Sequence, residues 1–130
     1  MFYENDWLMR QIDIIVEVLA RLIFHKDIVM YEYESKTSKT DTDQLYEKME
    51  ELCAQGKICE AEDLLFENAN PGSNKYLELA IDFYRRLEKM SDEELEKHNF
   101  SRQEIYDGLK EIVSRQKGLP PLPLFDDPQP

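Results

Sequence analysis

Apolar residues recur every three or four positions over most of the chain, and short polar breaks interrupt this pattern. Such spacing places the apolar side chains on one face of an α-helix, so it predicts a series of amphipathic helices. The clearest breaks are Gly56 and the sequence Asn70-Pro71-Gly72. Glycine accepts the left-handed conformation past a helix end, and proline cannot donate the next helical hydrogen bond. Residues 45–84 are therefore predicted to form helix, glycine turn, helix, proline turn, helix.

Helices joined by only a few residues fold back antiparallel and bury their apolar stripes against each other. The predicted fold class is accordingly all-α, with antiparallel helical hairpins, about six helices and no sheet. Two capping boxes, Ser91 to Glu94 and Ser101 to Glu104, predict the starts of the last two helices. Gly108 lies inside the sixth, where glycine costs about 1 kcal/mol relative to alanine, so we expect a close approach to another helix there.

The first predicted helix runs from a cap at Asn5 or Asp6 to about Phe24. Its apolar arc is wider than that of an ordinary surface helix, so the helix is expected to pack on two sides. Five apolar residues follow the alternating steps of four and three that are typical of a coiled-coil seam: Leu8, Ile12, Ile15, Leu19 and Leu22. Two explanations stay open at this point, namely core packing inside one chain or a seam between the two copies of a homodimer.

One helical domain is predicted over residues 1–118, because no linker typical of a domain boundary divides it. Its parts are an N-terminal helix region (1–33), a polar linker without apolar residues (34–43), a central helical core (44–90) and C-terminal helices (91–118). Residues 28–33 either extend the first helix or form a short extended piece. Thr42 or Asp43 is expected to cap the second helix.

Residues 119–130 form a proline-rich tail that cannot be helical and is predicted to be extended or polyproline-like. Pro120 and Pro123 have the PxxP spacing that aromatic grooves bind in other proteins. Three outcomes stay open for this tail. It lies across its own domain or a symmetry mate, it docks onto a separate polyproline-reading domain, or it is disordered.

Acidic residues outnumber basic residues by 28 to 16, which gives a formal net charge of -12. Such a charge repels nucleic-acid phosphates and anionic lipid headgroups, so neither nucleic acid nor a membrane is an expected partner, and a basic protein or peptide is favoured. Charged residues within the first helix also argue against a membrane span, since one charge at a bilayer centre costs about 2.5 to 3.5 kcal/mol. The N-terminus lacks the basic region and cleavage site of a secretory signal, which favours a cytoplasmic protein.

Residues able to carry out catalysis are sparse. The chain has two histidines and two cysteines, and it has no motif for phosphate cradling, zinc hydrolysis or a serine nucleophile. We therefore predict no enzyme activity, no cofactor and no metal. Cys53 and Cys59 are predicted as buried, small apolar residues, with a disulfide or redox pair as the alternative. A remote alternative is a metal-dependent hydrolase built from two acidic clusters, Glu60, Glu62, Asp63 and Glu67, and Asp92, Glu93, Glu94 and Glu96.

Two stretches of the chain resemble tetratricopeptide repeats. Residues 52–61 are similar to the centre of one repeat, where a glycine turn precedes an aliphatic residue and then Glu-Ala. Residues 76–83 resemble the opening helix of the next repeat, with a large, a small and an aromatic residue in order. The resemblance implies a tetratricopeptide-like core of about one and a half repeats, although Met49 and Asn68 stand where the repeat has small residues.

The whole chain up to about Gly118 also resembles a bacterial family of short, uncharacterised proteins, a domain of unknown function. Three stretches carry this likeness: residues 7–12, 56–66 and 98–105. The likeness implies a compact helical domain in a bacterial cytoplasm and supplies no activity. The proline-rich tail looks like an addition to it.

These observations favour a non-catalytic helical interaction module, or adaptor, that holds a protein partner. Four aromatic residues are predicted as contacts with that partner: Tyr46, Tyr76, Phe83 and Tyr84. Aromatic residues of the fourth helix are expected to serve the core first and a partner second. Three acidic residues are predicted to rim the contact: Glu47, Glu50 and Glu60. The alternative function is a structural homodimer assembled through the first helix.

Overall fold

The computed structural model describes residues 2–120, which form six helices and no strand. The predicted all-α fold with about six helices is therefore confirmed. The helices are α1 (Phe2–Leu22), α2 (Asp41–Ala54), α3 (Ile58–Glu67), α4 (Asn74–Glu88), α5 (Asp92–Lys97) and α6 (Arg102–Arg115). Residues 121–130 lie outside the described part of the chain, and the predictions for the PxxP tail fall largely on them.

The ends of several helices follow from the local sequence. Ser91 caps α5 and Ser101 caps α6, each accepting a hydrogen bond from the backbone three residues further on. At α6 the Glu104 carboxylate in turn accepts a hydrogen bond from the Ser101 N–H at 2.8 Å, which completes the predicted capping box. Gly56 follows α2 with a φ of 76°, the left-handed conformation that lets the chain turn into α3.

The start of α2 differs from the prediction. The N-cap is Thr40 rather than Thr42 or Asp43. The Thr40 hydroxyl accepts a hydrogen bond from the N–H of Asp43 at 3.2 Å, and the Asp43 carboxylate accepts one from the N–H of Thr40 at 3.2 Å. This reciprocal pair is a capping box with aspartate in place of the usual glutamate or glutamine, so the sequence pattern did not reveal it. The polar linker therefore ends at Thr40.

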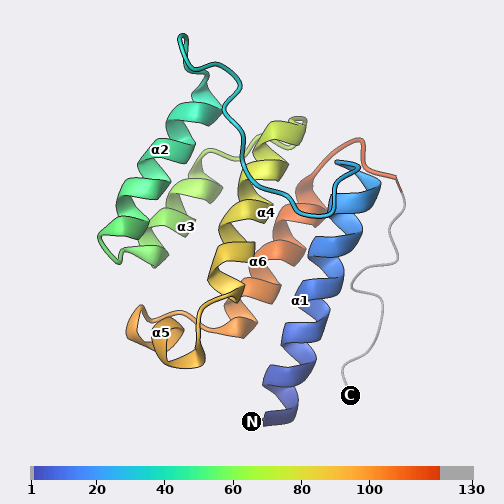
Figure 1. Ribbon diagram of the computed structural model, residues 1–130, viewed down its shortest axis with the longest axis vertical. Coiled ribbons are helices and arrows are strands. Elements are labelled where there is room, and N and C mark those ends of the chain that lie inside the picture. Colours follow the sequence, from blue (N-terminus) through green and yellow to red (C-terminus); the bar gives the residue numbers. More distant parts are fainter. Residues whose placement is uncertain (1, 121–130) are drawn as a thin grey trace.

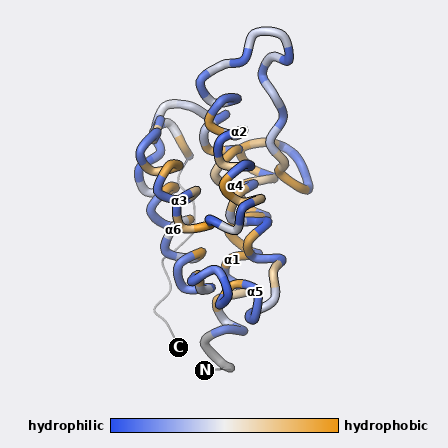
Figure 2. The backbone as a smooth tube through the Cα atoms, turned by 90° about the vertical axis from the view of Figure 1, so that its left-hand side faces the viewer, coloured by the Kyte–Doolittle hydropathy of each residue, from blue (hydrophilic) through white to orange (hydrophobic). Residues whose placement is uncertain are grey.

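The helix α4 lies at the centre of the molecule, between α2 on one side and α1 with α6 on the other (Figure 1). The hairpin of α2 and α3 turns at Gly56, and α6 packs against both α4 and α1. Hydrophobic positions of neighbouring helices face one another, while hydrophilic positions lie on the outside (Figure 2). As a consequence α4 is buried without a break from Tyr76 to Tyr84.

Gly108 of α6 and Tyr84 of α4 mark a very close approach between these helices. A Cβ atom at Gly108 would lie only 2.3 Å from the Tyr84 hydroxyl oxygen, well inside a normal contact distance. Any side chain larger than that of glycine would therefore collide with the tyrosine. The close helix approach predicted at Gly108 is confirmed.

The helix α1 begins at Phe2, ahead of the cap expected at Asn5 or Asp6, so that boundary was wrong. It packs against α6 and α4. Four of the five seam residues lie in the core of their own chain and are at most 5% exposed: Leu8, Ile12, Ile15 and Leu19. Leu22 is 52% exposed. Because α4 and α6 cover the side of α1 that a second copy would need, core packing is the explanation that fits the structure.

Residues 23–40, which we call the crossover segment, join α1 to α2 and pass over α4 (Figure 1). Within it, residues 29–33 are neither helical nor turned. Val29 and Tyr31 are 1% and 8% exposed, whereas Met30 between them is 59% exposed, an alternation typical of an extended chain. Of the two predictions for residues 28–33, the extended piece is the one that the structure supports.

Candidate interaction surface

The crossover segment presents an unusual number of exposed apolar side chains. Among residues 5–120, five large apolar side chains are at least 38% exposed: Ile14, Leu22, Ile28, Met30 and Tyr33. Single exposed apolar residues are ordinary, but three of these five lie within residues 28–33, and such grouping indicates a binding surface. We call Ile28, Met30 and Tyr33, together with the neighbouring Tyr46 of α2, the outer face.

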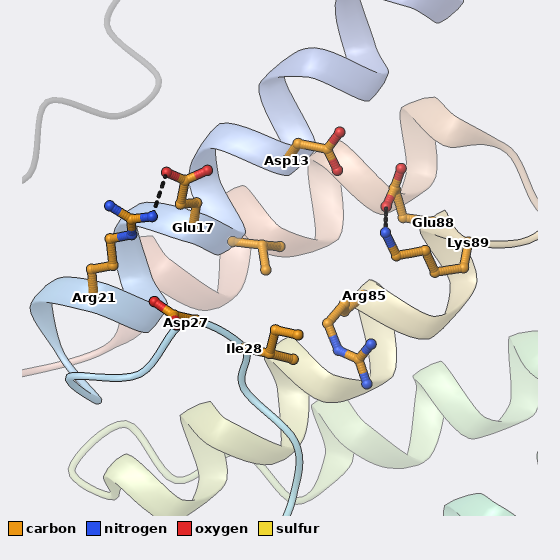
Figure 3. A pocket seen from close by; sticks show the side chains of 9 residues that line it. Asp13, Glu17, Arg21, Asp27, Ile28, Arg85, Glu88 and Lys89 are labelled. Atoms are coloured by element: carbon orange, nitrogen blue, oxygen red, sulfur yellow. Dashed lines mark ion pairs between the residues drawn. The ribbon is translucent and has the colours of Figure 1, made fainter.

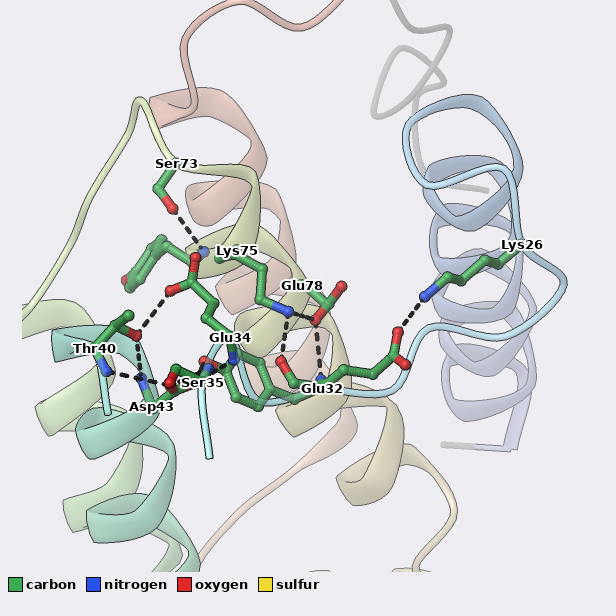
Figure 4. Close-up of polar contacts among 11 residues, drawn as sticks. Lys26, Glu32, Glu34, Ser35, Thr40, Asp43, Ser73, Lys75 and Glu78 are labelled. Atoms are coloured by element: carbon green, nitrogen blue, oxygen red, sulfur yellow. Dashed lines mark hydrogen bonds and ion pairs between the residues drawn. The ribbon is translucent and has the colours of Figure 1, made fainter. Parts of the chain in front are cut away.

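Charged side chains of α4 hold the main chain of the crossover segment. Arg85 donates a hydrogen bond from Nε to the Val29 carbonyl at 3.1 Å. Lys75 donates from Nζ to the Glu32 carbonyl at 2.5 Å, and the Glu32 N–H donates to Oε1 of Glu78 at 3.1 Å (Figure 4). Glu78 is 5% exposed and also pairs with Lys75 at 2.7 Å. These bonds position the segment through its backbone, while the side chains of Ile28 and Met30 remain 60% and 59% exposed.

Tyr31 anchors the same segment to α2. Its hydroxyl donates a hydrogen bond to Oδ1 of Asp43 at 2.5 Å, and its ring stacks on Tyr46 with 4.7 Å between the ring centroids. The Lys75 ammonium lies 4.7 Å from the centroid of the Tyr31 ring, within cation–π range. Burial and the hydrogen bond to Asp43 raise the pKa of Tyr31 well above its ordinary value, so the hydroxyl remains a donor.

Asp43 is a buried carboxylate that organises the second half of the crossover segment. It is 0% exposed and accepts hydrogen bonds from the Tyr31 hydroxyl and from the N–H groups of Glu34 at 2.9 Å, Ser35 at 3.2 Å and Thr40 at 3.2 Å (Figure 4). Burial alone would raise the pKa of Asp43, but these hydrogen bonds outweigh it and hold the pKa well below its ordinary value. The charged carboxylate thus keeps the segment folded against α2.

Tyr33 connects the crossover segment to the exposed side of α2. Its ring meets Tyr46 edge-on, with 5.6 Å between the centroids, and its hydroxyl donates to Oε2 of Glu47 at 3.2 Å. Glu47 also pairs with Lys39 at 2.6 Å. Tyr46 and Glu47 are both half-buried. The structure therefore brings these two residues, which the sequence suggested as partner contacts, together at the outer face.

The other residues suggested as partner contacts lie elsewhere. Glu50 forms an ion pair with Arg86 of α4, and Glu60 is exposed on α3 with no hydrogen bond or ion pair to another residue of the described chain. Three suggested aromatic contacts are at most 2% exposed: Tyr76, Phe83 and Tyr84. These three therefore belong to the core, as was expected first for the aromatic residues of this helix, and they are not available to a partner, because α1, α2 and α6 pack against α4.

A cavity of about 350 Å³ lies between α1, α4 and the start of the crossover segment (Figure 3). Charged side chains line it together with Val16 and Ile28. Glu88 of α4 is 7% exposed and forms an ion pair with Lys89 at 3.9 Å. Its carboxyl and that of Asp13 of α1 point toward one another in Figure 3. Burial, followed by the neighbouring Asp13 carboxylate, raises the pKa of Glu88 above its ordinary value. Sequence reasoning missed this pair because its members are far apart in the chain.

Comparison with known proteins identifies the family of the chain. Residues 2–117 match a family described as "Family of unknown function (DUF6483)". The chain belongs to this family. No curated protein and no solved structure matches it. The expected likeness to a domain of unknown function is confirmed, and the match ends just before the proline-rich tail.

The two cysteines of this DUF6483 chain are free thiols. Cys53 is half-buried, whereas Cys59 is exposed, with its sulfur 3.7 Å and 3.6 Å from the carbonyl oxygens of His98 and Asn99. The prediction that both thiols are buried is therefore wrong for Cys59. It is the second residue of α3 and lies beside the turn between α5 and α6 rather than under it.

Within the part of the chain that the structure describes, no three side chains of histidine, cysteine, aspartate or glutamate form a group that could hold a metal ion. None of the helices between residues 2 and 120 is both long enough and apolar enough to cross a membrane.

Proposed function

We propose that this member of DUF6483 is a non-catalytic interaction module that binds an extended segment of a partner protein on its outer face. The observation that carries the proposal is the exposure of Ile28, Met30 and Tyr33, at 60%, 59% and 38%, on a segment whose backbone α4 holds in place. Apolar surface removed from water contributes about 25 cal/mol per Å². A partner that covers these three side chains therefore gains binding free energy.

Preorganisation of the outer face supports this proposal. Tyr31 and Asp43 secure the crossover segment to α2, while Lys75 and Arg85 secure it to α4. Surfaces that are ordered before association lose less conformational entropy when a partner arrives. Most of the conformational entropy lost on binding is then lost by the partner segment, and the module keeps the same shape in the free and bound states.

Charge supports a partner with basic residues. Glu34 is exposed on the crossover segment, Glu47 borders Tyr33, and the whole chain has a formal net charge of -12. Opposite charges across an interface accelerate association, and this acceleration becomes weaker as salt screens the charges. Binding of the partner is thus expected to weaken as ionic strength rises.

The likeness to tetratricopeptide repeats is part of the proposal. Residues 52–61 span the turn between α2 and α3, and residues 76–83 lie within α4. Repeats of this kind stack helical hairpins and present partners with one side of the stack. Here the α2–α3 hairpin supports the outer face through Tyr46.

The two rival functions receive less support. A homodimer through α1 would need Leu8, Ile12 and Ile15, which are at most 5% exposed in the monomer. No observation on the described residues favours a metal-dependent hydrolase. An interaction module is therefore the function that the geometry supports best.

A display selection of random peptides on the wild-type chain tests the proposal. Selected peptides are then measured by fluorescence anisotropy against two variants, Met30→Asp and the matched control Ile14→Asp. Met30→Asp places a charge on the outer face, so it should weaken binding about tenfold or more. Ile14 is 49% exposed on α1, outside the outer face, and Ile14→Asp should leave binding unchanged. Failure to select any peptide, or peptides that bind both variants equally, would contradict the proposal.

A further inference from the structure

The two edges of the crossover segment differ in their hydrogen bonding. In an extended chain the N–H and C=O groups of one residue point to one edge, and those of the next residue point to the other. Both backbone groups of Glu32 are bound by α4, since its N–H donates to Glu78 at 3.1 Å and its C=O accepts from Lys75 at 2.5 Å (Figure 4). Earlier in the segment Arg85 donates to the Val29 carbonyl. Side chains of α4 therefore hold the start of the segment and the edge that contains Glu32.

The opposite edge contains the backbone of Tyr31 and Tyr33. Within residues 2–120, the main-chain N–H and C=O groups of these two tyrosines form no hydrogen bond. Their side chains are engaged instead, because the hydroxyls donate to Asp43 and Glu47 and both rings contact Tyr46. Side-chain contacts thus fix this edge in its extended form, while its main-chain groups have no partner in the described chain.

Unpaired backbone groups along an extended edge are a template for a further strand, because each N–H and C=O can bond to a chain laid beside it. We propose that the partner segment adds to the crossover segment as an antiparallel β-strand that pairs with Tyr31 and Tyr33. The inference rests on the proposed function, because the outer face supplies the contacts for the side chains of the partner. Each tyrosine then exchanges two backbone hydrogen bonds with the residue opposite it.

The exposed side chains of the segment define which partner strand fits. Met30, Glu32 and Glu34 alternate along the chain, and all three are exposed. Alternate side chains of an extended chain lie on one face, so the fitting strand has an apolar residue opposite Met30 and basic residues opposite the two glutamates. Within the described residues, the Glu34 carboxylate accepts a hydrogen bond from the Thr40 hydroxyl at 2.8 Å and has no cationic partner. The partner is therefore an extended segment in which a basic residue stands two positions from an apolar one.

A second copy of the chain is a less suitable occupant of this edge. Pairing Tyr31 of one copy with Tyr33 of the other would place the two Glu32 side chains directly opposite each other. Like charges in that position are destabilising, and each copy has a formal net charge of -12. Charge complementarity thus favours a basic partner over self-association.

A fluorescently labelled octapeptide, acetyl-Thr-Val-Thr-Arg-Thr-Val-Thr-Arg-amide, tests the inference on the whole chain. Valine and arginine share one face of this strand. When that face is aligned with Met30 in an antiparallel pair, the threonine N–H groups point at Tyr31 and Tyr33. N-Methylation of the threonines should therefore weaken binding about tenfold or more through lost hydrogen bonds, and N-methylation of valine and arginine should change it by less than about threefold. Fluorescence anisotropy measures the three peptides.

Amide hydrogen exchange followed by NMR gives a second readout on the protein itself. Bound octapeptide should slow exchange of the Tyr31 and Tyr33 N–H groups by at least about tenfold. Exchange at Met30, whose N–H belongs to the other edge, should stay within about threefold of its value in the unbound chain. Replacement of the arginines of the octapeptide by glutamate should weaken binding at least about threefold, because the new carboxylates face Glu32 and Glu34.

Equal effects of the two N-methylations, or unchanged exchange at Tyr31 and Tyr33, would overturn the inference. Absence of octapeptide binding at millimolar concentration would overturn it too, while the display selection still decides the proposed function. Exchange at these amides that slows with rising protein concentration alone would assign the edge to a second copy, which also overturns it. An octapeptide that binds Met30→Asp weakly yet tolerates N-methylated threonine refutes only the strand pairing. Protection of the tyrosine amides that persists in Met30→Asp refutes only the outer face.

Discussion

The hydroxyl oxygen of Tyr31 and a carboxylate oxygen of Asp43 lie 2.5 Å apart, and both residues are buried. This contact joins the crossover segment to the first turn of α2. Because Tyr31 alternates along the segment with the exposed Met30, the inner hydrogen bond and the outer apolar surface are parts of one short stretch. Whatever weakens the inner bond should also loosen the outer face.

Tyr31→Phe should lower the free energy of unfolding by about 1.5 to 3 kcal/mol, the usual contribution of a hydrogen bond to a charged group. Phenylalanine keeps the stacking on Tyr46, so the change isolates the hydroxyl. Tyr33→Phe is the matched control, since it removes a hydroxyl bonded to Glu47 at a site that is 38% exposed. It should cost less than about 0.5 kcal/mol. Urea unfolding at pH 7 measures both, and equal losses would contradict the role of the Asp43 contact.

Acid should destabilise the protein partly through Asp43. Its pKa is lower in the folded chain than in the unfolded chain, so its contribution is complete above the unfolded value of about 3.9 and is lost as pH falls through the folded value. Asp43→Asn should therefore be less stable than wild type at pH 6, and the difference should shrink between about pH 4 and 2. Urea midpoints over this range measure the effect. A constant difference would show that the carboxylate charge is unimportant.

Gly108→Ala should destabilise the protein by about 1 to 3 kcal/mol through overpacking. The new Cβ would lie 2.3 Å from the hydroxyl oxygen of Tyr84, and this side chain is 0% exposed, so it has no room to move away. Gly72→Ala is the control, because nothing lies within 4 Å of a Cβ built there. Thermal unfolding should show a large decrease in Tm for the first variant and little change for the second.

Substitution by aspartate at two neighbouring isoleucines of α1 should affect stability very differently. Ile15 is 2% exposed and Ile14 is 49% exposed. Ile15→Asp buries an unpaired charge and should unfold the chain, whereas Ile14→Asp should change stability by about 0.5 kcal/mol or less. Circular dichroism and sedimentation separate the explanations for α1. Loss of a dimer with helicity retained in Ile15→Asp would instead indicate a seam between copies.

Glu88 should show the opposite pH dependence from Asp43. Its pKa is higher in the folded chain than in the unfolded chain, so the folded state holds the proton more tightly and stability falls as pH rises through the folded value. Glu88→Gln should therefore be more stable than wild type at pH 8, and this advantage should diminish as pH falls toward 4. Unfolding curves at several pH values measure it. A variant less stable than wild type at pH 8 would contradict the raised pKa.

The sequence predicted the features that local chemistry decides. The turn at Gly56, the caps at Ser91 and Ser101 and the close approach at Gly108 each depend on one residue type in one short pattern, and each is confirmed. Hydrophobic periodicity likewise gave the all-α fold. These features need no knowledge of which helices become neighbours.

Features that depend on distant parts of the chain could not be predicted. Asp43 was placed in a solvated stretch, yet it is buried because Tyr31 and three backbone N–H groups satisfy it. Tyr76 and Tyr84 were expected to serve the core first and a partner second; their burial confirms the first role, and only the packing around α4 excludes the second. Asp13 and Glu88 are neighbours because of the way α1 lies against α4, and the spacing of residues along the sequence does not determine this packing.

The passage of the crossover segment over α4 also bears on how the molecule is assembled. Val29 and Glu32 rely on residues that follow them in the chain by 56 and 46 positions, and these must be made first. Contacts between residues so far apart in the sequence form slowly, because closing the long loop costs entropy before the contacts can stabilise the chain. During synthesis the apolar side chains of residues 28–33 therefore leave the ribosome long before the α4 residues that hold this segment have been made. In that interval the exposed apolar side chains are a binding target for a chaperone.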